Sequence, residues 1–415
     1  MRKLWIRSLG MMATFALLAG AAQAAPAGNA LFSPLAISPT YAKALNSDAS
    51  YRALADSPST AALELVRANA AVVEEKTVAL ALNLGAGLDL KIRRVEAYRT
   101  ESGSLVWTGI IEDAVKGIFK PDAVPFDPLN TVTLVRDGDM ITGNIHYNGD
   151  WYKIRPLQSG GHALVAVDQK AMPPDHPPAY ANLPVYKPVQ RPATKANTVI
   201  RVMVHYTPAA ASASGNISSL IDLAVAESNQ GYTNSGVSIT LQLATKAQVS
   251  YTESGSFSTD LSRYRGTADG FMDSIHTTRN STTADVGVLL INNTSACGLA
   301  SGIGSTASTA FVAVYWDCAT GYYSFAHEIG HLQSARHDPA NDPTTTPYAW
   351  GHGYQYTGSP KWRTIMAYDC SGGCPRLNYW SNPNNLYNGH PMGTISTNHN
   401  ARVLNDTRAT VAAFR

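Results

Sequence analysis

The N-terminal part of the chain alternates short apolar runs with turn residues. Pairs such as Asp137-Gly138 and Asn148-Gly149 stand between such runs, and these pairs favour tight hairpins between antiparallel strands. The predicted strands are Val78–Leu84, Leu88–Tyr98, Leu105–Ile111, Thr131–Val135, Met140–Tyr147, Trp151–Arg155 and His162–Val167. Before them, apolar residues at helical spacing from Ser59 to Lys76 predict one helix. We therefore expect a mostly antiparallel β domain with a single helix.

The C-terminal part shows a different pattern, in which apolar strands alternate with amphipathic helices. The predicted strands are Val199–Tyr206, Val237–Leu243, Val286–Ile291 and Ala310–Trp316. The predicted helices are Ser218–Asn229, Gly270–Thr278, one that carries the histidines discussed below, and a last one from Asn398 or Asn400 to Phe414. Such alternation predicts an α/β (α+β) fold with a mixed, mainly parallel sheet and helices packed on it.

A proline-rich segment separates the two patterns. Its prolines, which predict an extended and exposed linker open to proteolytic nicking, are Pro173, Pro174, Pro177, Pro178, Pro184, Pro188 and Pro192. At 415 residues the chain is longer than one typical domain. We therefore divide it into an N-terminal domain (25–171), a linker (172–195) and a C-terminal domain (196–415).

The first 24 residues have the features of a secretory signal peptide. Arg2, Lys3 and Arg7 precede an apolar run from Leu9 to Ala22, and Ala22-Gln23-Ala24 offers small residues for cleavage. The run is too short to span a bilayer stably, although an uncleaved anchor is the alternative. The remainder is expected to be exported. A net charge of only +2 argues against binding nucleic acid or a membrane surface.

The candidate chemistry lies in residues 327–338. His327 and His331 are four residues apart, so on a helix both imidazoles project from one face and can bind one zinc ion. Glu328 lies beside them, where its carboxylate can take a proton from the attacking water. His337 offers a third nitrogen, which leaves a fourth position open, as in catalytic zinc sites. The alternative is a surface helix that happens to carry histidines.

Two other residue types are alternatives for the third ligand. No glutamate follows Glu328, so a later glutamate is excluded. Asp338 is an alternative to His337, but imidazole is the commoner zinc donor, and we interpret Asp338 as a residue that fixes the loop. A Ca2+ ion is compatible with the chain, although no motif points to one.

All four cysteines lie in the C-terminal half. In an exported protein an even number favours disulfides over free thiols. Their order suggests pairing Cys297 with Cys318 and Cys370 with Cys374, although four cysteines allow three connectivities.

These motifs resemble those of the metzincin zinc endopeptidases. His327, Glu328, His331 and His337 match the extended zinc motif, and Met366 in Thr364-Ile365-Met366-Ala367-Tyr368 matches the methionine turn. The resemblance implies that Met366 forms a hydrophobic floor beneath the metal. Tyr368 stands where some members keep a tyrosine that binds the metal or the oxyanion, and His337-Asp338 resembles the reprolysin branch. Ser334 departs from the pattern, because the family has glycine there and a left-handed serine costs roughly 1 kcal/mol.

More narrowly, the chain is similar to the secreted bacterial peptidyl-Asp metallopeptidases. The segments that carry this resemblance are 205–208, 321–325, 374–383 and 400–415. It implies that residues 25–171 are a propeptide, that the enzyme cleaves on the amino side of Asp, and that it acts on proteins or peptides as a monomer. Arg376 is the first candidate for a cation in the Asp pocket, ahead of Lys361 and Arg363, while an exposed structural arginine remains the alternative.

Four further expectations concern mechanism and control. Glu328 would be the proton acceptor and later donor, and Tyr368 a donor to the oxyanion. Ala310–Trp316 would offer its edge to an extended substrate. The N-terminal domain has no cysteine to block the metal, so Asp150, Asp175 and His176 are candidate substitutes. The other class of function is an exported zinc-containing binding protein or adhesin in which Ser334 weakens catalysis.

Overall fold

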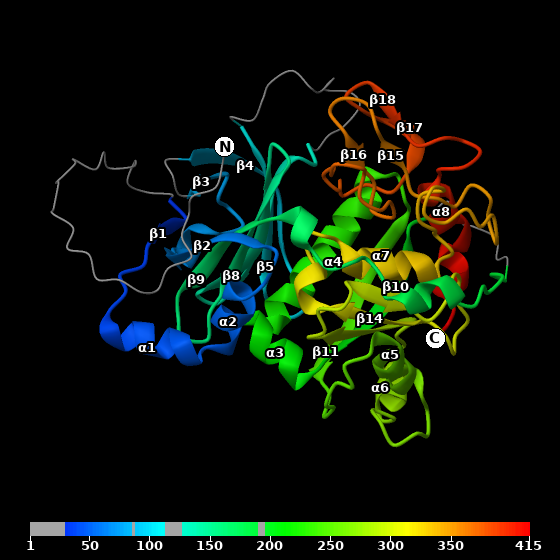
Figure 1. The fold of residues 1–415 in the computed structure, drawn as a ribbon, viewed down its shortest axis with the longest axis horizontal. Helices are drawn as coiled ribbons and strands as arrows, with labels where there is room; N and C mark the ends of the chain where they lie inside the picture. Colours follow the sequence, from blue (N-terminus) through cyan, green and yellow to red (C-terminus); the bar gives the residue numbers. More distant parts are fainter. Residues whose placement is uncertain (1–29, 85–87, 113–126, 190–195) are drawn as a thin grey trace.

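The computed structural model describes residues 30–84, 88–112, 127–189 and 196–415 (Figure 1). The predicted signal peptide, residues 1–24, lies outside these ranges. Within them, no helix combines the length and the apolar character that crossing a membrane requires.

The N-terminal part forms a nine-stranded antiparallel sheet. Its order is β1-β2-β9-β8-β7-β6-β5-β4-β3. The strands are β1 (Phe32–Pro34), β2 (Thr60–Ala68), β3 (Ala79–Asn83), β4 (Asp89–Arg99), β5 (Leu105–Ile111), β6 (Asn130–Asp137), β7 (Met140–Tyr147), β8 (Asp150–Pro156) and β9 (His162–Val167). Gly138 joins β6 to β7 with a φ of 60°, and Asn148 and Gly149 join β7 to β8 with φ of 51° and 91°. These left-handed residues confirm the predicted hairpins.

The helix predicted from Ser59 to Lys76 is wrong. Half of this segment is strand β2, which pairs antiparallel with β9 from Thr60 opposite Val167 to Val66 opposite His162. Its Ala, Leu and Glu content favours a helix in isolation, but the pairing with β9 outweighs that preference. The sheet also separates alternate residues, since Leu63 and Leu65 pack against one apolar core and Val66 against another. The helices lie upstream, as α1 (Pro39–Ser47) and α2 (Ala49–Ala55).

The C-terminal part forms a five-stranded mixed sheet with the order β11-β10-β12-β14-β13. The strands are β10 (Thr198–Tyr206), β11 (Ile239–Gln248), β12 (Val286–Ile291), β13 (Gly298–Ala300) and β14 (Phe311–Tyr315). The first four strands in this order run parallel to one another, and β13 is antiparallel to β14. The expectation that Ala310–Trp316 offers a free edge is wrong, because β14 has a partner on each side. The edge belongs to β13, which is too short to show an apolar pattern.

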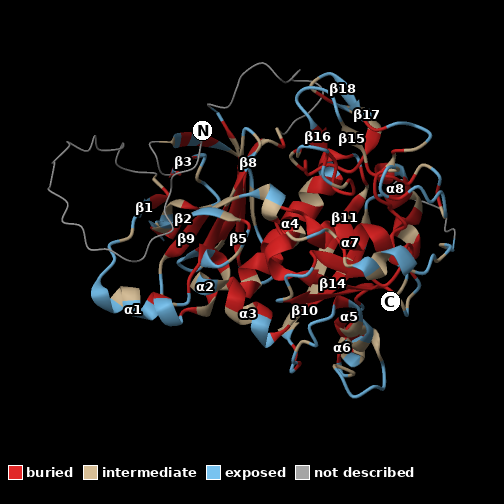
Figure 2. Ribbon diagram, viewed as in Figure 1, coloured by how far each residue is buried: buried red, intermediate tan, exposed pale blue. Residues whose placement is uncertain are grey.

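Helices cover this sheet, and short hairpins follow it. The helices are α3 (Pro208–Ser214), α4 (Ile217–Asn234), α5 (Phe257–Arg265), α6 (Ile275–Ser281), α7 (Ser324–Leu332) and α8 (Asn400–Val411). The hairpin strands are β15 (Gln355–Tyr356), β16 (Trp362–Arg363), β17 (Asn382–Tyr387) and β18 (His390–Met392). Helices α3 and α5 were not predicted from the sequence, and α6 begins five residues after the predicted start at Gly270. Helix α7 and the strands around it are almost entirely buried (Figure 2).

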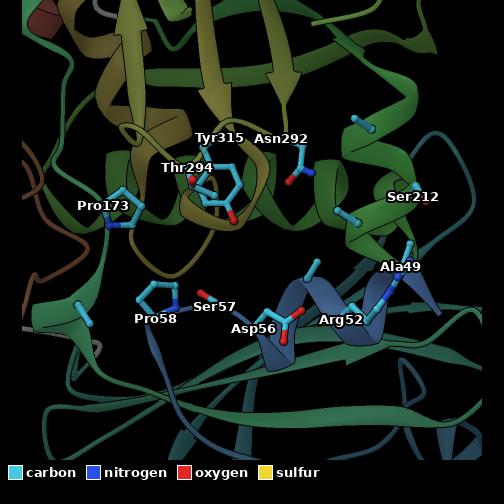
Figure 3. Close-up of a pocket in the computed structure, with 14 residues that line it drawn as sticks. Ala49, Arg52, Asp56, Ser57, Pro58, Pro173, Ser212, Asn292, Thr294 and Tyr315 are labelled. Atoms are coloured by element: carbon cyan, nitrogen blue, oxygen red, sulfur yellow. The ribbon is translucent and has the colours of Figure 1, made fainter. Parts of the chain in front are cut away.

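The two sheets pack against each other through α4, which contacts β6 and β7 on one side and β11 and α7 on the other (Figure 1). A buried ion pair crosses this boundary, with Lys153 Nζ on β8 2.7 Å from Asp317 Oδ2. Beside it, Arg155 donates to the Thr320 hydroxyl (3.0 Å). A cavity of about 740 Å³ also lies between the two parts, lined by Arg52, Asp56, Ser212, Asn292, Tyr315 and others but by no histidine (Figure 3).

Candidate metal centre

Helix α7 carries the first two candidate ligands and is wholly buried. It begins after Tyr323, whose φ of 63° turns the chain sharply into the helix. A Cβ on Gly330 would lie 2.7 Å from the ring of Trp380 and 3.2 Å from Met366 Sδ. Only a residue without a side chain allows this approach, so Gly330 lets the helix pack closely against Trp380 and Met366.

The turn after α7 brings the third histidine back toward the helix. Ser334 N–H donates to the His331 carbonyl (2.9 Å) and Ala335 N–H to the Gly330 carbonyl (2.9 Å), which are the two bonds of a Schellman motif. Ser334 has a φ of 75°, the left-handed conformation that the family's glycine suggested. The serine adopts the turn without displacing His337 from the other histidines.

Replacing Ser334 by glycine should therefore stabilise the protein. Glycine removes the steric penalty of a left-handed side chain, so the free energy of unfolding should rise by about 1 kcal/mol. Chemical denaturation of the two chains measures the difference. A glycine variant that is less stable than the parent would show that contacts of the buried serine side chain stabilise the fold by more than its left-handed conformation destabilises it.

Three histidines converge on one point. Nε2 of His337 lies 3.1 Å from Nε2 of both His327 and His331. Nδ1 of His327 is 2.9 Å from the Ile365 carbonyl, and Nδ1 of His331 is 2.8 Å from the Ala335 carbonyl. A carbonyl only accepts, so each Nδ1 carries the proton and each Nε2 presents a lone pair. The lone pairs of His327 and His331 therefore both face His337 Nε2, and a cation bound among the three nitrogens would stabilise this arrangement.

A fourth histidine, His176, joins this cluster from the proline-rich segment. Its Nε2 lies 3.1 Å from Nε2 of His331. One donor atom of each member lies within 4.8 Å of every other, and the members are His176, His327, His331 and His337. Three of the six distances between their Nε2 atoms are 3.1 Å. A regular tetrahedron with edges of this length has its centre about 1.9 Å from each corner, close to a zinc–nitrogen bond of about 2.0–2.1 Å. The residues therefore fit a metal ion such as zinc.

Burial keeps these imidazoles neutral. Burial lowers the pKa of His331 to about 4 and that of His176 to about 3. The pKa values of His327 and His337 lie well below the ordinary range, because burial and then the neighbouring histidines oppose a positive charge. Neutral imidazole is the form that binds a metal.

Glu328 lies beside the cluster without belonging to it. Its Oε1 is 3.1 Å from His176 Nε2, and burial raises its pKa to about 8. A Cβ on Gly298 of β13 would lie 2.4 Å from the same oxygen. The glycine therefore makes room for the carboxylate between the helix and the edge strand.

The predicted methionine turn lies under the helix. Met366 is fully buried, and the preceding carbonyl, of Ile365, is the partner of His327. Tyr368 N–H donates to Asp338 Oδ1 (2.9 Å), so Asp338 fixes the loop, as expected. Burial raises the pKa of Tyr368. Its hydroxyl therefore keeps a proton to donate, and it lies 3.3 Å from His176 Nδ1.

Arg376 is buried rather than exposed, and it binds Asp175. Its Nη2 lies 2.8 Å from both carboxylate oxygens of Asp175, and Nη1 donates to the Tyr322 carbonyl (3.1 Å). Arg363, the less favoured candidate, lies 3.8 Å from the same carboxylate. Burial alone would raise the pKa of Asp175, but the two guanidinium groups lower it below its ordinary value. Lys361 is exposed and binds the Ser371 carbonyl instead.

The proline-rich segment follows the sheet edge, so the prediction of a freely exposed linker is wrong for the part up to Tyr186. Four backbone hydrogen bonds join it to residues 297–303: Cys297 N–H to the Pro174 carbonyl (2.8 Å), Gly298 N–H to Asp175 (3.1 Å), Ile303 N–H to Pro184 (2.9 Å) and Tyr186 N–H to Ile303 (2.8 Å). The edge strand is thus paired on its free side. This pairing buries His176, although the prolines of the segment by themselves predict a chain exposed to solvent.

Tyr180 is a site residue that no sequence motif selects. Its ring lies 4.4 Å from that of His337 and 5.1 Å from that of His331. Its hydroxyl donates to Asp342 (2.9 Å). Asp150, by contrast, begins β8 in an exposed hairpin and is not part of the cluster. Of the three candidate blocking residues, Asp175 and His176 are at the site.

Both predicted disulfides are present, Cys297–Cys318 and Cys370–Cys374. The first ties the edge strand to the chain that leads into α7. The second closes the loop between the methionine turn and Arg376. Both bonds therefore support the walls of the site.

Comparison with known proteins gives a consistent result. A family model described as Metallo-peptidase family M12 matches residues 196–381. A peptidyl-Asp metalloendopeptidase of Stenotrophomonas maltophilia is 53% identical over 414 residues, covering 96% of each chain. One of Xanthomonas campestris is 51% identical over 421 residues, covering 99% of this chain and 100% of the relative. Metalloproteinase-II of Bacteroides fragilis, a crystal structure, is 14% identical with a TM-score of 0.40 over 63% of this chain and 81% of its own. So distant a likeness carries no argument.

Proposed function

The chain belongs to the peptidyl-Asp metalloendopeptidase family and is a metalloendopeptidase, and from that premise we propose that it is a secreted zinc enzyme with His327, His331 and His337 as ligands. The observation that supports this ligand set is the convergence of three Nε2 atoms, with that of His337 3.1 Å from those of His327 and His331. Zinc suits a set of neutral imidazoles with tetrahedral spacing. No motif points to an additional Ca2+ ion.

In the proposed reaction Glu328 carries the proton. Its carboxylate accepts a proton from the attacking water and then delivers it to the nitrogen of the leaving amine. When bound, the metal supplies a Lewis acid that polarises the scissile carbonyl and acidifies water. Tyr368 keeps its phenolic proton and donates a hydrogen bond to the developing oxyanion. Met366, buried against Gly330 of α7, would form the hydrophobic floor beneath the histidines.

We assign the Asp preference named for the relatives to a pocket formed by Arg376 and Arg363. Among the described residues, Asp175 is the carboxylate paired with Arg376. Once this segment leaves, a buried guanidinium is left without its counter-ion, so a substrate carboxylate that enters the pocket regains the lost hydrogen bonds.

Arg376→Ala should abolish this preference. We expect the ratio of kcat/KM for an Asp peptide to that for its Asn analogue to fall about 100-fold, because a charged hydrogen bond to a buried partner is lost. The ratio is insensitive to the fraction of active enzyme. Lys361→Ala, an exposed lysine nearby, serves as the matched control and should leave the ratio unchanged. An unaltered Asp preference in Arg376→Ala would remove the assignment.

We further propose that residues 25–171 are a propeptide, that residues 172–195 link it to the catalytic domain, 196–415, and that the enzyme acts as a monomer. The buried contacts of β8 with Asp317 and Thr320 support a propeptide docked on the loop before α7. Residues 1–24 would direct export. Two disulfides with no free cysteine in the described ranges suit an oxidising compartment.

The test is the activity and metal content of the secreted form. We expect one zinc per chain by elemental analysis, hydrolysis of casein, loss of activity with a chelator and recovery on adding zinc. N-terminal sequencing should place the start of the active form near Lys195. An active form that starts near Ala25 would contradict the propeptide assignment, and casein hydrolysis that survives complete metal removal would contradict the zinc mechanism.

A further inference from the structure

We propose that Asp175 and His176 are a built-in inhibitor, in which His176 supplies a fourth nitrogen to the metal and Asp175 fills the pocket meant for the substrate aspartate. The inference rests on the proposed function, since it assigns a regulator to the same site. It names the two side chains that keep the full-length chain latent.

His176 closes the position that catalysis needs open. Its Nε2 lies 3.1 Å from Nε2 of His331 and 3.1 Å from Oε1 of Glu328. Its side chain is 1% exposed, and Nδ1 faces the hydroxyl of Tyr368 at 3.3 Å. One imidazole thus touches a metal ligand, the base and the oxyanion donor. Four protein ligands are typical of structural zinc sites, which are inactive because no position is left for substrate.

Asp175 mimics the side chain that the pocket selects. Both of its oxygens lie 2.8 Å from Arg376 Nη2, and Arg363 lies 3.8 Å away. A substrate aspartate would need the same buried guanidinium. The adjacent residues Asp175 and His176 therefore block the specificity pocket and the metal together.

The backbone holds these two side chains in place. The carbonyl of Pro174, which belongs to the peptide bond before Asp175, accepts a hydrogen bond from Cys297 N–H (2.8 Å). An enzyme that cleaves on the amino side of Asp would select the Pro174–Asp175 bond. His176 prevents this cleavage, because its imidazole occupies the fourth position of the metal site. The prolines at 173, 174, 177 and 178 restrict the chain before binding, so less entropy is lost on holding it.

Tyr180 adds a cover over the same cluster. Its ring packs on His331 and His337, and its hydroxyl is tied to Asp342, which in turn pairs with Arg336 (2.8 Å). The segment from Asp175 to Tyr180 is therefore anchored at both ends. Cleavage near Lys195 would allow the whole segment to leave together with the N-terminal part.

Metal coordination is tested on the full-length Glu328→Gln chain, which cannot process itself. Loaded with Co2+, it should show the absorption of a four-nitrogen tetrahedral site. His176→Ala should change this visible spectrum, since water replaces a nitrogen. It should also accelerate metal loss to excess EDTA by about tenfold or more. Asn182→Ala, an exposed residue of the same segment, is the matched control and should match the parent.

The role of Asp175 is tested by activity in the chain that retains Glu328. Freshly prepared protein, shown by mass spectrometry to be uncleaved, should hydrolyse an Asp peptide slowly. His176→Ala and Asp175→Asn should each raise the initial rate about tenfold or more, and Asn182→Ala should not. His176→Gln, of similar size, provides a second substitution if the alanine variant fails to fold.

The outcomes separate the two proposals. If the His176 variants have the same cobalt spectrum and the same rate of metal loss to EDTA as Asn182→Ala, the inhibitor proposal is overturned, even when the protein hydrolyses casein. Equal initial rates for the uncleaved parent, His176→Ala and Asp175→Asn would overturn it as well. If no form binds metal or hydrolyses casein, including material cleaved within the linker, the proposed function itself fails.

Discussion

Replacing Glu328 by glutamine should lower proteolysis by a factor on the order of 10²–10⁴ while leaving the metal bound, because general acid–base catalysis contributes about that much. Glutamine has the shape of glutamate but cannot accept the proton of the attacking water. The carboxylate lies outside the histidine cluster, so its loss should not remove a ligand. Casein and Asp-peptide hydrolysis measure the rate, and elemental analysis measures the metal.

Two controls separate catalysis from structure. His337→Ala removes a proposed ligand, so it should lose both activity and metal, whereas Glu328→Gln should lose activity alone. The purified Glu328→Gln chain should also stay uncleaved, since it cannot process itself. Turnover by the glutamine variant at the parental rate would exclude Glu328 as the base.

Asp317→Ala should destabilise the full-length chain by about 3–5 kcal/mol, because it leaves the buried ammonium of Lys153 without its partner. The two side chains are 1% and 3% exposed and lie 2.7 Å apart. Arg155 adds a second positive charge nearby. Burial already lowers the pKa of Lys153, and Asp317 opposes this effect. Without Asp317 the pKa falls further, so the deficit should shrink as the pH rises and Lys153 loses its proton.

The measurement is denaturant unfolding of the Glu328→Gln chain, with and without the substitution, at several pH values. Lys153→Met combined with Asp317→Leu replaces the pair by apolar groups and should recover most of the lost stability. If Asp317→Ala alone costs less than about 1 kcal/mol, the ion pair does not hold the N-terminal sheet to the loop before α7.

The residues that local chemistry selects were predictable from the sequence. The spacing of His327 and His331 places them on one helical face whatever surrounds the helix, and the absence of a later glutamate left His337 as the third candidate. The left-handed Ser334 followed from the family's glycine. Turn pairs such as Asn148-Gly149 predicted hairpins because few other residues adopt left-handed conformations readily.

What depends on distant partners was not predictable. Residues 60–68 have the composition of a helix, but pairing with β9 makes them a strand, because tertiary pairing outweighs weak intrinsic preferences. The edge strand next to the site is β13, a three-residue strand whose position follows from its partner β14. Arg363 joins Arg376 because residues on two chain segments meet beside Asp175.

The sequence by itself thus determined which residues can hold a metal and move a proton, since helical spacing and side-chain chemistry are local properties. The tertiary structure alone decided what faces that metal. His176 lies 155 residues before His331, in a segment whose prolines predicted exposure, and only its pairing with the edge strand brings it to the cluster. Contacts between residues so far apart are set by packing of the whole chain, and no local pattern records them.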